Sequence, residues 1–190
     1  MQHNSFLLKN NRNKLANSQE ILEETDFSNQ RVVLALYEAL SSHDVATVHQ
    51  IVAPDLEWWF HGPPSHQFLM RLLTGTDPAS ATSFRFVPQS ITSFGPTVLV
   101  EGCDHVLSIS WVHACTVSDG IITQIREYFN TSLTVTRLRN SGPSSPPSDL
   151  TSTSSSSSTA ATTPLHCPSL WESSVSSRVG KSVPGLVLAI

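Results

Sequence analysis

The sequence predicts an α+β domain in which helices come first and a run of antiparallel strands follows. Two observations favour this fold class. Apolar residues recur at helical spacing between residues 32 and 52, and runs rich in β-branched and aromatic residues follow from residue 56 to residue 130. Asp119-Gly120 joins two of these runs, and this dipeptide suits the positive φ angles of a tight hairpin turn. We therefore assign residues 26–140 to one folded domain.

The first 25 residues are polar and rich in Asn, and we expect them to be flexible. They hold too few apolar residues for the hydrophobic segment of a secretory signal. Lys9, Arg12 and Lys14 precede the first acidic residue, Glu20, so an organellar transit peptide is an alternative. The segment is short of Arg and Ala and has no clear apolar face, which counts against that alternative.

Two amphipathic helices are expected before the first strand. Ser28 and Asn29 are candidate caps for the first helix. The second begins near Asp44 and ends at Pro54, because a proline ring cannot continue a helix. The apolar stripe of the first helix contains Val32, Val33, Leu36, Tyr37 and Leu40, and that of the second contains Val45, Val48, Ile51 and Val52.

Strands follow the two helices. The aromatic segment Leu56–His61 is the first strand, and Gly62-Pro63-Pro64 closes it. A short helix over Gln67–Leu73 ends at Gly75. Further strands are expected at 84–92, 97–103, 105–117 and 121–130, and Pro88 marks an edge or a bulge in the first of these.

Alternation along the long hairpin indicates which side chains share a face. Odd positions from His105 to Val117 are mostly apolar and form the inner face, whereas Ser108, Ser110 and Thr116 point the other way. On the returning strand the inner face holds Ile121, Thr123, Ile125, Glu127 and Phe129, provided that no bulge shifts the register. An acid on such a face is either paired with a neighbour such as His113 or functional.

The order of these elements resembles the nuclear transport factor 2-like (SnoaL-like) superfamily. The resemblance rests on the two helices, on Leu-Glu-Trp-Trp-Phe-His-Gly-Pro at 56–63, on the short helix, and on a meander that ends Asp-Gly-Ile-Ile-Thr-Gln-Ile-Arg-Glu-Tyr-Phe-Asn at 119–130. More closely, Arg-Glu-Tyr-Phe-Asn-Thr-Ser at 126–132 and the tail at 171–190 resemble the plant wound-induced protein 1 family. The resemblance covers residues 27–139 and this tail.

The resemblance implies a cone-shaped, curved antiparallel sheet that packs with the N-terminal helices around a hydrophobic cavity. It also implies a homodimer, and induction by wounding, senescence or defence signals, but no settled reaction. Cys115 stands where a Trp is expected in this family. That change would reshape the cavity.

The candidate ligand contacts are large aromatic residues and three polar residues of the strands. Each has a structural alternative, because aromatic residues on strands commonly form ordinary core and a hydrogen-bonded histidine commonly has a structural role. The cavity itself follows from the fold. The set consists of Trp58, Phe60, His61, Trp111, His113, Glu127 and Phe129.

The catalytic patterns of the superfamily are not matched, so no catalytic residue is predicted. The ketosteroid isomerase branch carries a carboxylate base on the first strand and a tyrosine on the first helix; those positions fall at Phe60 or His61 and at Leu36, which lack the required groups. Epoxide-hydrolysing relatives use an Asp-Arg-Asp arrangement. The nearest set here is Asp104, Arg126 and Glu127, of which the last two are adjacent on a strand and point to opposite faces.

No metal or cofactor is predicted either. Cys103, His105, His113 and Cys115 suit a metal by type, but His105 and His113 on one strand would lie about 26 Å apart at about 3.3 Å per residue. A single tetrahedral ion cannot gather them.

A linker and a tail follow the domain. Residues 141–165 are mostly Ser, Thr and Pro, and we expect them to be disordered because they cannot bury enough apolar surface to offset the entropy of ordering. The tail at 166–190 carries Trp171, Val175 and Val179 at helical spacing, followed by an apolar strand-like end. We expect this tail to dock, on its own domain in preference to a dimer mate or another partner.

Charge and cysteine usage bound the partners and the compartment. A net charge of -4 without a Lys/Arg cluster argues against nucleic acid, and no apolar run reaches the length of a membrane span. Three cysteines without a secretory signal predict reduced thiols and a cytoplasmic location, with the nucleus as the alternative.

Three classes of function remain open. The favoured one is a non-catalytic, stress-responsive protein that binds a small hydrophobic ligand in the cavity. The second is an isomerase, cyclase or hydrolase that acts on a hydrophobic metabolite, with Glu127 and His113 as an acid–base pair. The third is a dimeric protein-interaction module that recruits partners through its tail.

Overall fold

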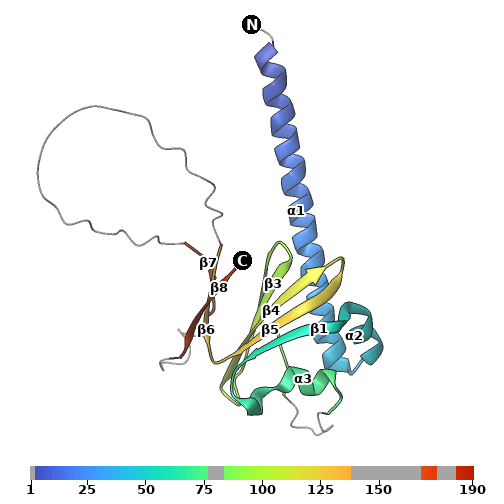
Figure 1. Cartoon of the computed structure of the whole chain (residues 1–190), viewed down its shortest axis with the longest axis vertical. Coiled ribbons are helices and arrows are strands. Elements are labelled where there is room, and N and C mark those ends of the chain that lie inside the picture. The colour runs from blue at the N-terminus through green and yellow to red at the C-terminus, as the bar shows by residue number, and fades with distance from the viewer. Residues whose placement is uncertain (1–2, 77–83, 138–167, 175–182) are drawn as a thin grey trace, which may run out of the picture.

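The computed structural model describes residues 3–76, 84–137, 168–174 and 183–190, with side chains from residue 19 onward. A five-stranded sheet lies over helix α1, and a separate three-stranded sheet lies on its other side (Figure 1). The α+β class and the packing of N-terminal helices on a curved sheet are confirmed. The elements before the meander are α1 (His3–Ser42), α2 (Val45–Ile51), β1 (Val52–His61), a 3₁₀ turn (Pro64–His66) and α3 (Phe68–Leu73).

Helix α1 begins earlier than the sequence predicted. Ser28 and Asn29 lie inside this helix and do not cap it. The Asn29 side chain instead donates a hydrogen bond to the carbonyl of Gly95 at 3.1 Å, so it fixes the helix to the sheet. The predicted apolar stripe is confirmed, since Val33, Leu36, Tyr37 and Leu40 are buried and Val32 packs against them. Further toward the N-terminus, Ile21, Leu22 and Phe27 are more than half exposed.

Helix α2 is short and begins at the predicted residue. The carboxylate of Asp44 accepts hydrogen bonds from the backbone N–H and the hydroxyl of Thr47, which lower the pKa of Asp44. The helix ends at Ile51, before the proline expected to stop it, because β1 already begins at Val52.

The main sheet is mixed, whereas an entirely antiparallel sheet was predicted. Its strand order is β1-β5-β4-β3-β2, with β2 (Ser90–Phe94), β3 (Thr97–Asp104), β4 (Ile109–Ser118) and β5 (Ile121–Phe129) forming an antiparallel meander. Strand β1 pairs with the last strand of this meander and runs parallel to it. A parallel neighbour needs a long crossover, which the chain supplies through α3 and strands β2–β4.

Two strands are shorter than predicted. Residues 84–89 are not a strand, although Phe84 and Phe86 are buried, so their hydrophobicity reflects core packing outside regular structure. Strand β4 begins at Ile109 because the carboxylate of Asp104 accepts hydrogen bonds from the backbone N–H groups of Val106 and Leu107, both at 2.9 Å. These bonds form the β3–β4 turn.

A bulge in the β4–β5 hairpin changes the predicted register. Val117 pairs with Ile122, whereas Thr116 pairs with Gln124, which leaves Thr123 as the extra residue. The inner face of β5 therefore carries Ile122 in place of Ile121 and Thr123. From Ile125 onward the predicted alternation is confirmed, so Ile125, Glu127 and Phe129 are all fully or nearly fully buried.

Both faces of the main sheet are buried, whereas the sequence predicted one apolar face. The inner face, with Trp111 and Cys115, packs on the helices as expected. On the outer face, Val112, Ala114 and Tyr128 form a second core with the three-stranded sheet. That sheet has the order β7-β6-β8 and consists of β6 (Ser132–Thr136), β7 (Ser169–Glu172) and β8 (Gly185–Ala189).

The tail thus lies on its own domain. Strand β7 is antiparallel and β8 is parallel to β6, and Leu188 is buried in the second core. Trp171 lies on a strand and not on the predicted helix; Val175, Val179 and the linker 141–165 lie outside the described residues. The predicted homodimer stays a prediction, and pairing through the outer face of the main sheet would have to accommodate this second sheet.

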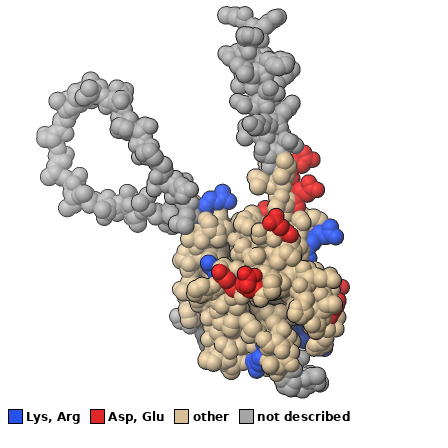
Figure 2. Space-filling view, turned by 45° about the vertical axis from the view of Figure 1, so that its right-hand side comes forward, with Lys and Arg blue, Asp and Glu red and all other residues tan. Residues whose placement is uncertain are grey.

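On the face shown in Figure 2, Lys and Arg side chains are scattered and do not form a basic stripe. No helix in the described part of the chain combines the length and the apolar character needed to cross a bilayer.

Candidate functional site

A chain of four hydrogen-bonded side chains crosses the inside of the fold. The hydroxyl of Tyr37 on α1 lies 2.8 Å from Nδ1 of His113 on β4. Nε2 of His113 lies 3.2 Å from Oε1 of Glu127 on β5, and Oε2 of Glu127 accepts a hydrogen bond from Nε1 of Trp58 on β1 at 3.0 Å. One arrangement satisfies all four groups: Tyr37 donates to Nδ1, and His113 donates from Nε2 to the carboxylate. We call Tyr37, His113, Glu127 and Trp58 the polar chain.

Three members of the polar chain are buried, and the fourth, Trp58, is half-buried. His113 and Glu127 are both 0 % exposed, so the pairing of this acid that the sequence suggested is present. The pKa of Tyr37 is raised well above its ordinary value. The main cause is burial, and the neighbouring Cys115 and Glu127 add to it. Burial, and then Glu127, raise the pKa of the Cys115 thiol to about 12. Tyr37 and Cys115 therefore stay protonated at neutral pH.

Aromatic rings fill the space around the polar chain. Trp111 packs edge-on against Phe86, with ring centroids 5.1 Å apart, and lies 5.7 Å from Tyr37. The rings of Phe129 and Phe60 pack with their centroids 5.9 Å apart. The interior that the resemblance implied to be hollow is thus packed with rings at these positions.

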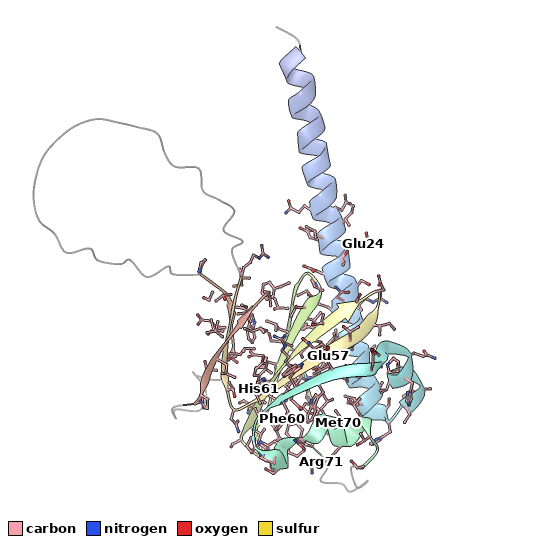
Figure 3. The ribbon with its side chains drawn as sticks, in the orientation of Figure 1. Glu24, Glu57, Phe60, His61, Met70 and Arg71 are labelled. Carbon is pink, nitrogen blue, oxygen red and sulfur yellow. The ribbon has the colours of Figure 1, made fainter. Side chains whose placement is uncertain are left out.

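Six of the seven predicted ligand residues lie together on the inner face, and His61 does not. Trp58 and Phe60 point inward from β1, whereas His61 points to the other side and stacks on Tyr128, with ring centroids 4.8 Å apart (Figure 3). Successive residues of a strand point to opposite faces, so Phe60 and His61 could not both face the interior. Trp58, His113 and Glu127 belong to the polar chain, and Phe60, Trp111 and Phe129 pack in the core beside it.

Tyr37 was not among the predicted site residues. It was predicted as a member of the apolar stripe of the first helix, beside Leu36, where the isomerase branch carries its tyrosine. A signal was present, because a tyrosine on a buried stripe needs a hydrogen-bond partner, and His113 on an apolar strand face needs one too.

An open groove lies beside the polar chain, and none of the four residues of the polar chain lines it. It has a volume of about 580 Å³ and runs between α2, the start of β1 and α3. We call it the α2–α3 groove. Its apolar lining includes Val48, Leu56, Met70 and Leu73. Leu56 lies two residues before Trp58 on β1, so both point to the same face of the sheet.

The curved, mixed sheet over α1 defines the class of the protein as an α+β domain whose N-terminal helices pack on one face of the sheet. The family follows from the sequence comparison. A family model described as "Wound-induced protein WI12" matches residues 70–190, and the chain belongs to that family. The family expected from the motifs is therefore confirmed.

Two relatives share more than half of their residues with the matched part. Wound-induced protein 1 of Solanum tuberosum is 56 % identical over 121 residues, which cover 64 % of this chain and all of the relative. Senescence associated gene 20 of Arabidopsis thaliana is 54 % identical over 127 residues, again covering 64 % of this chain and all of the relative. This is a protein of the wound- and senescence-associated class.

Solved structures resemble the chain more distantly. An NTF2-like protein from Burkholderia xenovorans has a TM-score of 0.40 and 24 % identity, and the match covers 55 % of this chain and 90 % of that one. An NTF2-like protein from Burkholderia pseudomallei has a TM-score of 0.44 and 20 % identity, with 54 % and 90 % covered. These likenesses say nothing about activity.

Proposed function

We propose that this wound-induced family member binds a small, largely apolar molecule in the α2–α3 groove. The observation that carries the proposal is the groove itself. It has a volume of about 580 Å³, within the range of roughly 300–1,000 Å³ that is typical of small-molecule sites. Its walls come from three separate elements, α2, β1 and α3, so the surrounding fold fixes its shape.

The polar chain supports the proposal by holding one wall of the groove. Strand β1 is an edge strand of the sheet, and Leu56 on this strand lines the groove. Two residues further on, Trp58 donates a hydrogen bond to Glu127. Glu127 is hydrogen-bonded to His113, and His113 is hydrogen-bonded to Tyr37. A wall anchored by buried hydrogen bonds is preorganised, which lowers the entropy lost when a ligand binds.

The chemistry of the groove favours a neutral ligand with one hydrogen-bonding group. The apolar lining suits a hydrocarbon body, whereas the exposed His49 and Asp55 at the rim suit a hydroxyl or carbonyl. A role for His113 and Glu127 as an acid–base pair stays a prediction. Both side chains are 0 % exposed, so a substrate would have to displace packed rings to reach them.

Titration of the full chain with 1-octanol tests the proposal. We expect the indole N–H signal of Trp58 in a ¹⁵N correlation spectrum to shift on addition of the alcohol, because the ligand packs next to Leu56. The Trp58→Phe variant assigns that signal. Met70→Trp should block the groove and weaken octanol binding at least about tenfold, since Met70 lines the groove and projects from α3 (Figure 3).

Val106→Trp is the matched control, because Val106 is 92 % exposed at the β3–β4 turn. This variant should bind octanol as the unmodified chain does. Equal affinity in Met70→Trp and Val106→Trp would overturn the proposal. An octanol-induced shift confined to signals away from α2, β1 and α3 would also overturn it.

A further inference from the structure

A second pocket lies on the opposite side of the main sheet, between its outer face and the C-terminal sheet. Its volume is about 470 Å³. The walls come from the β2–β3 turn, from β4 and β5, and from the end of β8, which lies beside that turn in Figure 1. We call it the tail pocket. It shares no lining residue with the α2–α3 groove.

Two arginines line the tail pocket. Arg126 projects from the outer face of β5, and Arg137 follows the end of β6. Burial raises the pKa of Tyr128, and Arg126, which hydrogen-bonds to its phenol, partly opposes that effect. The guanidinium has five N–H donors, so one phenol leaves most of them available. Among the residues that the structure describes, neither arginine takes part in an ion pair.

The rest of the lining is mainly apolar or uncharged. Phe94 and Pro96 come from the β2–β3 turn, Ala114 from β4, and Leu188 and Ile190 from the C-terminal segment. Glu57 does not line the pocket, although its carboxylate accepts a hydrogen bond at 2.6 Å from the lining residue Gln124. Two cations therefore face a hollow with apolar walls and no described carboxylate side chain in its lining.

We infer that the tail pocket binds a small amphipathic anion, with an apolar body against Phe94, Ala114 and Leu188 and one carboxylate or phosphate between Arg126 and Arg137. A guanidinium binds either head group through paired N–H donors. The C-terminal segment supplies one wall, so the site exists only when that segment is docked. This site is independent of the proposed function, since it differs from the α2–α3 groove in position and in the charge that it selects.

Isothermal titration of the full chain with octanoate tests the inference, and octyl phosphate in a parallel titration separates a carboxylate ligand from a phosphate ligand. We expect one of these probes to bind. Arg126→Gln and Arg137→Gln should each weaken that binding at least about tenfold. Binding should also weaken as NaCl is added, because salt screens the charge interaction. Arg85→Gln is the matched control, since Arg85 is exposed and lies at a different hollow.

Thr97→Trp provides a second variant in case an arginine variant unfolds. Thr97 lines the tail pocket, so a bulky ring there should abolish anion binding with both arginines intact. Met70→Trp should leave anion binding unchanged, which separates this site from the α2–α3 groove. The inference is overturned if neither anion binds, if both arginine variants bind as Arg85→Gln does, or if inorganic phosphate binds as tightly as octyl phosphate.

Discussion

At the residue scale, Glu127 has two hydrogen-bond partners that depend on it, the buried His113 and the half-buried Trp58. Its carboxylate accepts hydrogen bonds from Trp58 and pairs with His113. Glu127→Ala leaves both partners unsatisfied, and each unpaired buried donor costs about 1–3 kcal/mol. We expect the free energy of unfolding, measured with urea, to fall by at least about 1 kcal/mol.

Glu127→Gln tests the same point with less disruption, because the amide oxygen still accepts one hydrogen bond. It should destabilise the fold less than Glu127→Ala does. Glu57→Ala is the matched control on the same sheet, since Glu57 is exposed and bonds only to Gln124 among the described residues. If Glu127→Ala were no more costly than Glu57→Ala, the polar chain would have no structural role.

Cys115 makes the stability depend on pH in the alkaline range. Burial and Glu127 raise its pKa from 9.0 to about 12 in the folded state. A group with a raised folded-state pKa contributes stability that is fully present below its unfolded pKa and is lost as the pH rises through the folded value. The contribution should therefore be complete below about pH 9 and should decline from there toward about pH 12.

Cys115→Ala isolates this contribution in urea unfolding series at rising pH. The unmodified chain should lose stability more steeply above pH 9 than the variant does. The pKa of Tyr37 is raised mainly by burial, which both chains share, and the smaller effect of Cys115 on Tyr37 is lost in the variant and adds to the same difference. Parallel curves for the two proteins would contradict the assignment.

At the element scale, the β3–β4 pair needs a glycine opposite a tryptophan. Gly102 pairs with Trp111, and a Cβ at residue 102 would lie less than 3.0 Å from the Trp111 ring and from the carbonyl of Val87. Gly102→Ala should therefore cost roughly 1–3 kcal/mol through overpacking. Gly185→Ala on β8 is the control, because nothing lies within 4 Å of a Cβ there. Thermal unfolding of both variants checks the difference, and equal melting temperatures would refute it.

Local patterns predicted the elements better than their pairing. The helical stripe through Leu36 and the strand alternation at Trp111 depend on residues close in sequence, and both were predicted. The parallel pairing of β1 with β5 was missed because no local pattern specifies which distant strand becomes a neighbour. The bulge at Thr123 was missed because it shifts register without a glycine to mark it.

The candidate site shows the same division. Strand parity along the hairpin predicted the common face of Trp111, His113, Glu127 and Phe129. Trp58 and Phe60 were predicted only as aromatic residues of the first strand, and they lie in the same site. His61 was wrongly predicted to face the interior, and it stacks on Tyr128 on the other face. An aromatic cluster on a strand does not reveal which of its members point inward. Tyr37 was missed because its role appears only when α1 is placed against β4. The second core was also missed, since its cover combines β6, which was not predicted as a strand, with strands from beyond the long Ser/Thr/Pro segment.

At the scale of the whole molecule, the C-terminal segment is part of the folded unit, and matched leucine and valine variants test this. Leu188 is 6 % exposed in the second core, whereas its neighbour Val187 is 70 % exposed on the same strand. Leu188→Ala should cost about 2–5 kcal/mol, and Val187→Ala should change stability by no more than about 0.5 kcal/mol. Hydrogen exchange at Leu133 and Val135 of β6 should accelerate only in Leu188→Ala, because these residues pack in the same core. If the two variants unfolded at the same urea concentration and β6 exchanged equally in both, β8 would not be docked in solution, and the tail pocket that it completes would not form.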